Sequence, residues 1–253
     1  MLISKLRRKF GFISDHSGII SRYFNEEKNW FEHLNNTKKI ILENTQGKNN
    51  CLIIGSGWCL DVPVVELSKI YNKVFLADII HPGQVVHKMK RFPNIEFLTL
   101  DVSGILELLY QYKKNNEKNL SLYEFLQKYI GISFVNKYKP DFVVSVNILS
   151  QLAFFPDKYI EKYGLTSKKE QFLIRELIEK KHLEILPEGK SVLITDYYES
   201  EYSLNGNFIN GHERLSVSLP KEKIIKEWVW DFDLSGNYYT GNPVRFKVAA
   251  LQV

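Results

Sequence analysis

Cysteine is nearly absent from this sequence, which has only Cys51 and Cys59 among its 253 residues. Two cysteines exclude a disulfide framework and a cysteine-held iron–sulfur cluster, and they favour a reducing, cytoplasmic setting. No apolar run approaches the length that spans a bilayer, and the start, MLISKLRRKFGF, lacks the extended apolar core of a signal peptide. Internal repeats and low-complexity tracts are absent too.

Neither positively nor negatively charged residues are in large excess. The formal net charge is +5, with Lys and Arg spread among Asp and Glu, so the composition does not require an acidic partner. The apolar fraction of 44% and the charged fraction of 25% are those of a globular protein. The length allows one large α/β domain or two small ones.

The stretch CLIIGSGWCLD, residues 51–61, organises what is present. Its first apolar residues are typical of a strand buried on both faces, and Gly55 and Gly57 then interrupt the apolar pattern. Apolar residues return at helical spacing over 64–70. A strand, a tight glycine turn and a helix direct free backbone N–H groups at a polar ligand and let it approach the backbone closely. The sequence therefore predicts a ligand site at this turn.

Further strands and helices alternate along the chain. Apolar runs predict strands at 74–78, 95–101, 142–147 and 191–196, with helices at 85–89, within 105–138 and at 167–186. Two last strands, 226–232 and 244–253, are joined by a segment too short for a crossover helix, so they form an antiparallel hairpin. The fold class is therefore α/β, with a doubly wound, mostly parallel seven-stranded sheet that ends in a C-terminal antiparallel hairpin.

An N-terminal helical cap precedes this sheet. The apolar pattern over 17–44 predicts a helical pair, with a break at 35–37, where Asn-Asn-Thr can cap the second helix. Residues 1–14 carry four cations among apolar residues. Such an arm can bind a membrane surface or nucleic acid, but its short length favours simple packing or fraying.

Acidic residues follow two of the predicted strands. Asp78 lies roughly 20 residues after the glycine turn, the spacing at which a carboxylate meets a nucleotide ribose in a βαβ unit. Asp101 follows the third strand and Asn147 follows the fourth. Ligands of such sheets bind outside the carboxyl ends of the strands, so we expect these side chains near one cleft.

The motifs IIGSG, FLAD, LTLD, DFVVSVN and LPEGKSVLITD occur in this order. Together they are similar to the motifs of class I (Rossmann-like) S-adenosylmethionine-dependent methyltransferases, over residues 48–253. The resemblance implies a Rossmann-like methyltransferase domain at 48–253, with an arm and helical cap at 1–47, as one structural unit. Two positions depart from the family pattern: Ile53 stands where an acid is common, and Cys59 stands where a third glycine is common.

The resemblance implies S-adenosyl-L-methionine as the cofactor and assigns residues to its parts. The glycine turn would hold the methionine part, with Asp61 as a compensating charge, and Asp78 would bind the ribose hydroxyls. Asp101 would face the adenine amino group. The full set implied for the cofactor is Gly55, Ser56, Gly57, Asp61, Asp78, Ile79, Asp101, Val102 and Asn147. No His, Asp or Cys spacing indicates a metal site.

Candidates for the chemistry follow the fourth and fifth strands. His212 is the best base by residue type, and it lies in a non-helical segment that can fold over the cleft. Asn147 and Gln151 can orient a methyl acceptor through their amides. The aromatic segment 154–163 and the N-terminal helices suggest a small or medium organic acceptor, methylated on oxygen or nitrogen. The other histidines at helical or terminal positions, His16, His33, His87 and His182, are expected to be surface or packing residues.

Three other functions compete with this one. An NAD(P)-dependent oxidoreductase also places an acid after the second strand. Such an enzyme predicts a catalytic Tyr-Lys pair, four residues apart, just after the fifth strand. The only pair with this spacing, Tyr110 and Lys114, precedes the fourth strand. A nucleic-acid methyltransferase is disfavoured, because Asn147 is not followed by Pro-Pro and neither cysteine lies near it. A non-catalytic protein that binds S-adenosylmethionine stays open because of Ile53 and Cys59. The sequence does not indicate an oligomeric state.

Overall fold

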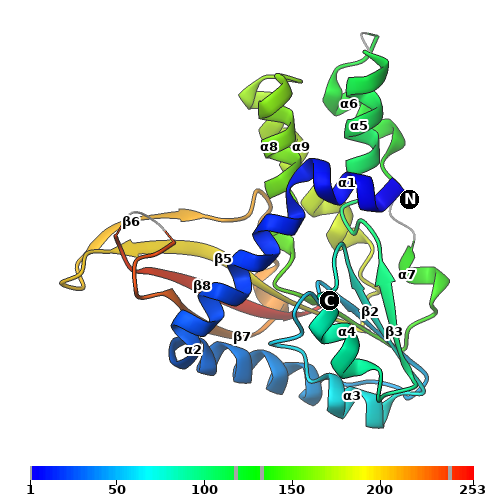
Figure 1. Cartoon of the computed structure of the whole chain (residues 1–253), viewed down its shortest axis with the longest axis vertical. Coiled ribbons are helices and arrows are strands. Elements are labelled where there is room, and N and C mark those ends of the chain that lie inside the picture. The colour runs from blue at the N-terminus through cyan, green and yellow to red at the C-terminus, as the bar shows by residue number, and fades with distance from the viewer. Residues whose placement is uncertain (1, 117–118, 132–133, 239–240) are drawn as a thin grey trace.

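The computed structural model describes residues 2–116, 119–131, 134–238 and 241–253 (Figure 1). One sheet runs through them in the order β3-β2-β1-β4-β5-β8-β7, with β6 paired to β5. Five neighbouring strands are parallel, and β6, β7 and β8 run antiparallel to their neighbours. This confirms the predicted mostly parallel sheet with its terminal hairpin, although the sheet has eight strands rather than seven. The strands are β1 (Asn50–Ile54), β2 (Lys73–Asp78), β3 (Ile95–Thr99), β4 (Phe142–Val146), β5 (Ser191–Tyr202), β6 (Phe208–Glu213), β7 (Ile224–Asp233) and β8 (Val244–Gln252).

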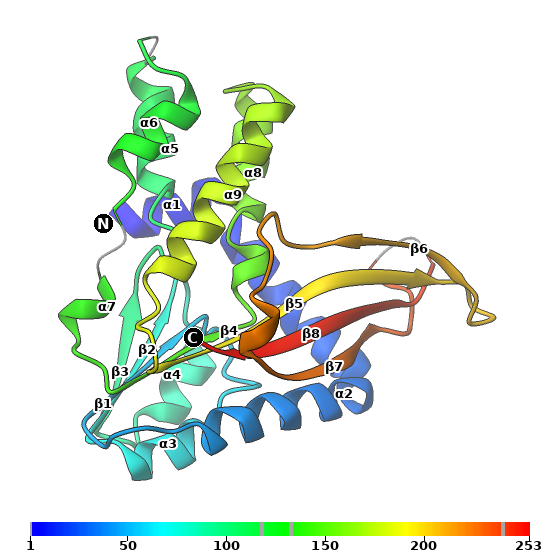
Figure 2. The same cartoon turned by 180° about the vertical axis from the view of Figure 1, so that it is seen from behind.

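Helices cover both faces of the sheet, as a doubly wound fold requires. Successive residues of β1 show the division: Leu52 and Ile54 belong to one apolar core, and Cys51 and Ile53 belong to the other. The first core also contains residues of the helices α5 to α9. In Figures 1 and 2, α5 with α6 and α8 with α9 project from the sheet on the same side. The helices after α2 are α3 (Val64–Ile70), α4 (Gly83–Met89), α5 (Leu106–Asn115), α6 (Leu122–Tyr129), α7 (Phe134–Lys137), α8 (Phe154–Tyr163) and α9 (Lys168–Glu184).

The N-terminal segment forms α1 (Leu2–Phe10) and α2 (Phe12–Glu43). Leu6 and Phe10 of α1 are buried in the core, so this basic segment packs on the protein. The predicted break at 35–37 is wrong. Asn36 accepts a hydrogen bond from Lys226 Nζ at 2.7 Å and Thr37 is fully buried, so tertiary contacts occupy the residues that could have capped a new helix.

The helix α2 instead bends at Glu26, whose φ of −115° and ψ of 17° are not helical. Its carboxylate accepts a hydrogen bond from the backbone N–H of Ser235 at 2.9 Å. Four residues later, Trp30 donates from Nε1 to the carbonyl of Phe232 at 2.8 Å. These contacts hold the bent helix against β7, and Figure 1 shows the two halves of α2 running in different directions past the sheet.

The aromatic segment 154–163 and the segment after the fifth predicted strand both form regular secondary structure. Residues 154–163 form α8, in which Pro156 lies in the first turn, where its missing N–H costs nothing. The strand predicted to end at Asp196 continues to Tyr202, because β8 pairs with it as far as Glu201. The open segment predicted after it contains β6, which returns alongside β5. These long strands extend to one side of the molecule in Figure 2.

Candidate functional site

A cavity of about 260 Å³ opens at the carboxyl ends of β1, β2, β4 and the first part of β5. This is the switch point of the sheet, where β1 is flanked by β2 on one side and β4 on the other. The glycine turn, the end of β2 at Asp78 and Ile79, and the residues Asn147 and Ile148 after β4 form its floor. Its walls come from α2, α8, β7 and β8. The polar lining comprises Arg22, His33, Ser56, Asp61, Asp78, Asn147, Ser150, Gln151, Asp196 and Arg214.

Gly55 begins the turn in a backbone conformation that favours glycine, with φ of +87°. A side-chain carbon at this position would lie 2.6 Å from the carbonyl oxygen of Val146 and 2.8 Å from Cβ of Ile148. The N–H of Gly55 donates to the carbonyl of Ala77 at 2.9 Å. The first glycine is therefore required by the close approach of β1 to the end of β4.

Cys59 has a backbone conformation that favours glycine, although it carries a side chain. Its φ of +53° is in the left-handed region that glycine adopts most readily. Its N–H closes the turn by donating to the carbonyl of Ser56 at 2.7 Å. Burial raises the pKa of the Cys59 thiol to about 12, with the nearby Asp61 and Asp78 acting in the same direction. The thiol is therefore protonated at neutral pH and is no nucleophile.

Asp78 ends β2 and faces both the cavity and the turn. Its Oδ2 accepts a hydrogen bond from the N–H of Gly57 at 2.8 Å, and its Oδ1 accepts one from the N–H of Ile80 at 3.2 Å. Burial raises the pKa of this carboxyl to about 6, against the lowering effect of those hydrogen bonds. Asp78 thus holds the glycine turn in place, and it lines the cavity together with the next residue, Ile79.

Asp101 and Val102 are not brought to the cavity that the described residues form. Asp101 accepts hydrogen bonds from the N–H and Oγ of Ser103 at 2.9 and 2.6 Å, and from the N–H of Leu106 at 2.9 Å. Its carboxylate therefore satisfies backbone donors at the start of α5. Val102 is buried in the apolar core.

Asn147, just after β4, joins two residues from distant parts of the chain. Its φ is +48°, and its Nδ2 donates to Asp61 Oδ2 at 2.7 Å and lies 3.1 Å from His33 Nε2. Burial raises the pKa of Asp61, and the hydrogen bond from Asn147 opposes that shift. The backbone carbonyl of Asn147 accepts a hydrogen bond from Gln151 Nε2 at 3.0 Å, and Gln151 also lines the cavity.

His33 was expected to be a surface or packing residue, and the expectation missed its place in the cavity. The ring is 1% exposed and stacks on Trp230 with centroids 3.8 Å apart and planes 4° apart. Trp228 Nε1 lies 3.1 Å from its Nδ1. Burial lowers the pKa of His33 to about 3, so the imidazole is neutral. Its position three residues after Trp30 on an apolar helix stripe is the signal that could have marked it as inward-facing.

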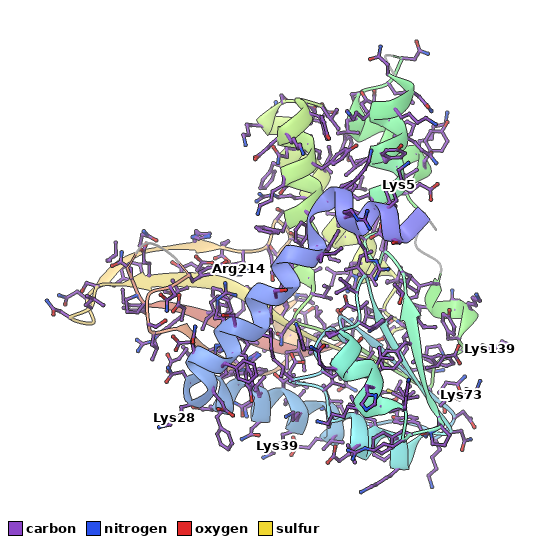
Figure 3. The ribbon with its side chains drawn as sticks, in the orientation of Figure 1. Lys5, Lys28, Lys39, Lys73, Lys139 and Arg214 are labelled. Carbon is purple, nitrogen blue, oxygen red and sulfur yellow. The ribbon has the colours of Figure 1, made fainter. Side chains whose placement is uncertain are left out.

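A second charged group lies at the end of the cavity formed by β5. Arg214 pairs with Asp196 and with Glu199, and its guanidinium lies 4.2 Å from the ring centroid of Phe246. Ser150 Oγ donates to both oxygens of Asp196, at 2.8 and 2.9 Å. Figure 3 labels Arg214 beside the extended strands. No local pattern marks Arg214, because its partners are 15 and 18 residues away in the chain.

His212 lies two residues before Arg214, on β6, opposite Glu199 in the strand ladder. Its side chain is exposed, and it is not part of the cavity lining formed by the described residues. The loop expected to fold over the cleft is a strand edge here, so the structure does not bring His212 to the cofactor motifs.

Aromatic side chains form most of the remaining wall. Arg22 lies over the rings of Phe232 and Tyr238, at 4.9 and 4.8 Å from their centroids. Two buried polar atoms that belong to lining residues, Ser56 Oγ and Trp230 Nε1, have no hydrogen-bond partner among the described residues. The aromatic lining comprises Phe12, Trp30, Trp58, Phe154, Phe155, Trp230, Phe232, Tyr238 and Phe246.

Within the part of the chain that the structure describes, no group of three or more His, Cys, Asp or Glu side chains is placed to hold a metal ion. No described helix combines the length and the apolar character needed to span a membrane.

Comparison with known proteins found similar solved structures but no similar sequences. No family model matches the sequence, and no curated protein matches it. Among solved structures, Burkholderia thailandensis 1,6-didemethyltoxoflavin-N1-methyltransferase with bound S-adenosylhomocysteine is 10% identical, with a TM-score of 0.41 over 94% of this chain and 87% of its own. The DhpI-SAM-HEP complex is 9% identical, with a TM-score of 0.39 over 94% of each chain. The 23S rRNA methyltransferase ErmE is 9% identical, with a TM-score of 0.34 over 87% of this chain and 68% of its own.

Proposed function

We propose that this protein is an S-adenosylmethionine-dependent methyltransferase that acts on a small or medium organic acceptor, at oxygen or nitrogen. The observation that carries the proposal is the layout of the cavity. One end holds a glycine turn and a buried acid, as a nucleoside-containing cofactor requires, and the other end holds a separate set of polar and aromatic side chains.

The residues of the first end fit the cofactor. Gly55 packs against the end of β4, which fixes the turn, and the turn residues Gly55, Ser56 and Gly57 line the cavity. Ser56 Oγ is buried and has no partner among the described residues, which leaves a hydroxyl for a ligand group. Asp78 would bind the ribose hydroxyls, with Ile79 beside the adenine. When bound, S-adenosylmethionine supplies an activated methyl group on a sulfonium.

Asp61 and Asn147 would receive the amino-acid part of the cofactor. Ile53 takes the position where class I methyltransferases commonly have an acid, and it is fully buried in the core. Asp61 lines the cavity instead and is held by Asn147 at 2.7 Å. A carboxylate that lies close to a ligand ammonium is a strong, charge-assisted partner.

The second end would align the acceptor. Gln151 and Ser150 present polar atoms between the cofactor motifs and the aromatic wall, and Trp230 adds an unpartnered indole N–H. Aromatic surfaces exclude water and hold a flat or apolar acceptor, and alignment of two reactants supplies much of the acceleration of a displacement reaction. The aromatic lining of the cavity supports a small organic acceptor over a folded nucleic acid.

A pair of matched variants tests the cofactor site. Asp78→Asn should weaken the binding of S-adenosylhomocysteine about tenfold or more, because a charge-assisted contact contributes roughly 1.5–3 kcal/mol. Asp141→Asn is the control. That carboxylate also accepts two backbone N–H groups, from Lys48 and Asn49 at 3.0 and 2.7 Å, but it lies at the amino end of β4 and outside the cavity lining that the described residues form.

Equal affinity in the two variants would remove Asp78 from the site. Turnover is tested separately, by measuring S-adenosylhomocysteine release with panels of amines, phenols, carboxylic acids and RNA. Release with a small organic acceptor supports the proposal, and release with RNA alone overturns the acceptor class. Tight cofactor binding with no release under any acceptor would favour a non-catalytic binding protein.

A further inference from the structure

Both ring nitrogens of His33 face hydrogen-bond donors. The indole N–H of Trp228 lies 3.1 Å from Nδ1, and an indole nitrogen can only donate. On the other side, Nδ2 of Asn147 lies 3.1 Å from Nε2 while it donates to Asp61. A neutral imidazole has one donor and one acceptor nitrogen, so it cannot accept at both.

The burial of the ring decides which charge state to consider. His33 is 1% exposed, and burial holds its pKa at about 3, so the ring carries one proton and no charge. A second proton would make matters worse, because both nitrogens would then donate toward donors. Since the indole fixes Nδ1 as an acceptor, the single proton must be on Nε2.

An Nε2–H needs an acceptor, and the amide of Asn147 is the group that faces it. A half-turn of that amide about its last bond places Oδ1 toward His33 and toward Asp61. Oδ1 would then lie close to a carboxylate oxygen, which is repulsive unless that oxygen carries a proton. Before this rotation Oδ1 is the buried amide atom without a partner among the described residues, and after it Nδ2 is. The rotation therefore improves only the contacts to His33 and Asp61.

We propose that Asp61 carries a proton when the cavity is empty, donates it to Asn147 Oδ1, and releases it when a ligand ammonium takes its place. The change is an acid dissociation alone: the Asp61 O–H bond breaks, the proton leaves to solvent, and the carboxylate meets the incoming cation. Asn147 keeps its Oδ1 toward His33, and the ligand cation takes the place of the Asp61 proton beside it. Asn147 and His33 are positioning residues, since they act through Asp61.

The charges around Asp61 support this assignment. Asp78 faces it from the end of β2, and Cys59 faces it from the glycine turn. The negative charge of Asp78 repels a negative charge on Asp61. Lys38 of α2 is the cation that favours the charged form, and its effect is the smallest of those on Asp61. Burial, the largest effect, favours the protonated acid and raises its pKa.

Nuclear magnetic resonance of ¹⁵N-labelled histidine tests the first step without any ligand. His33 should show the Nε2–H tautomer, and His33→Gln identifies its signals. Trp228→Phe removes the indole donor and should allow the Nδ1–H tautomer, with Asn147 Nδ2 then donating to Nε2. An Nδ1–H tautomer in the wild type would overturn the proposal.

Calorimetry in buffers of different ionisation enthalpy tests the second step, with S-adenosylhomocysteine as the probe. The wild type should release about one proton for each ligand bound near neutral pH. Asp61→Asn should release none, while Asp78→Asn should still release it despite weaker binding. This step rests on the proposed function, and the outcomes separate the two. Binding without proton release in the wild type refutes the role of Asp61, whereas no binding refutes the cofactor and leaves the histidine spectra to decide the protonation state.

Discussion

Replacement of Gly55 by alanine tests the construction of the glycine turn. A side-chain carbon there meets the carbonyl oxygen of Val146 at 2.6 Å and Cβ of Ile148 at 2.8 Å, and neither is the free end of a flexible side chain. The left-handed backbone, with φ of +87°, costs about 1–2 kcal/mol for an L-residue. Overpacking against rigid neighbours costs about 1–3 kcal/mol more. The expected loss of unfolding free energy is therefore about 2–5 kcal/mol.

Urea unfolding measures this loss as a lower midpoint at an unchanged slope. Gly18→Ala is the control, because Gly18 lies within α2 and a carbon there meets nothing within 4 Å. That substitution should stabilise the protein by roughly 0.5–1 kcal/mol, since alanine favours a helix interior over glycine. A wild-type midpoint for Gly55→Ala would refute the predicted clash with Val146 and Ile148. Wild-type affinity of Gly55→Ala for S-adenosylhomocysteine would refute the link between the turn and the ligand site, since the turn after β1 must move to accommodate the alanine methyl group.

Three further outcomes are expected. Asp101→Asn should lower the unfolding free energy by about 1–2 kcal/mol through lost hydrogen bonds at the start of α5 and leave cofactor affinity unchanged, and weaker binding at full stability would instead support a contact with adenine. Glu179 accepts hydrogen bonds from the N–H groups of Ser216 and Val217 at 2.7 and 3.0 Å, and burial raises its pKa to about 7. Because Glu179 then binds a proton more tightly in the folded state, its contribution to stability is full below about pH 4.5 and falls by on the order of 3 kcal/mol as the pH rises to about 7. Glu179→Gln should therefore flatten the pH profile of urea unfolding. An unchanged profile would refute the pKa shift. His212→Asn should leave both cofactor affinity and methyl transfer near wild type, because His212 is exposed on β6, and a loss of turnover of a hundredfold or more would restore it as the base.

The central part of the fold could be predicted from local patterns. The parallel parts of the five strands are short and mostly apolar, and glycine, acid and turn residues follow them, so each could be located without knowledge of its neighbours. The same holds for Gly55, Gly57 and Asp78, whose spacing placed them in one site. These features depend on residues close in sequence, which is where pattern arguments work best.

The errors concern features that distant contacts decide. The helix α2 continues past Asn35 because Asn36 and Thr37 meet the sheet, and β5 runs on to Tyr202 because β8 pairs with it. His33 reaches the cavity only because α2 bends at Glu26 and lies against β7. Arg214 joins the site through acids on a neighbouring strand. A single sequence does not show which of its segments will meet.

Isothermal titration of the wild-type protein with S-adenosylhomocysteine and, separately, with NAD⁺ tests the central claim most directly. The glycine turn, the buried Asp78 and the Asp61–Asn147 pair at one end of the cavity predict saturable binding of S-adenosylhomocysteine, weakened about tenfold or more in Asp78→Asn. They predict no comparable binding of NAD⁺. Clear binding of NAD⁺, with no heat from S-adenosylhomocysteine at millimolar concentration, would contradict the account.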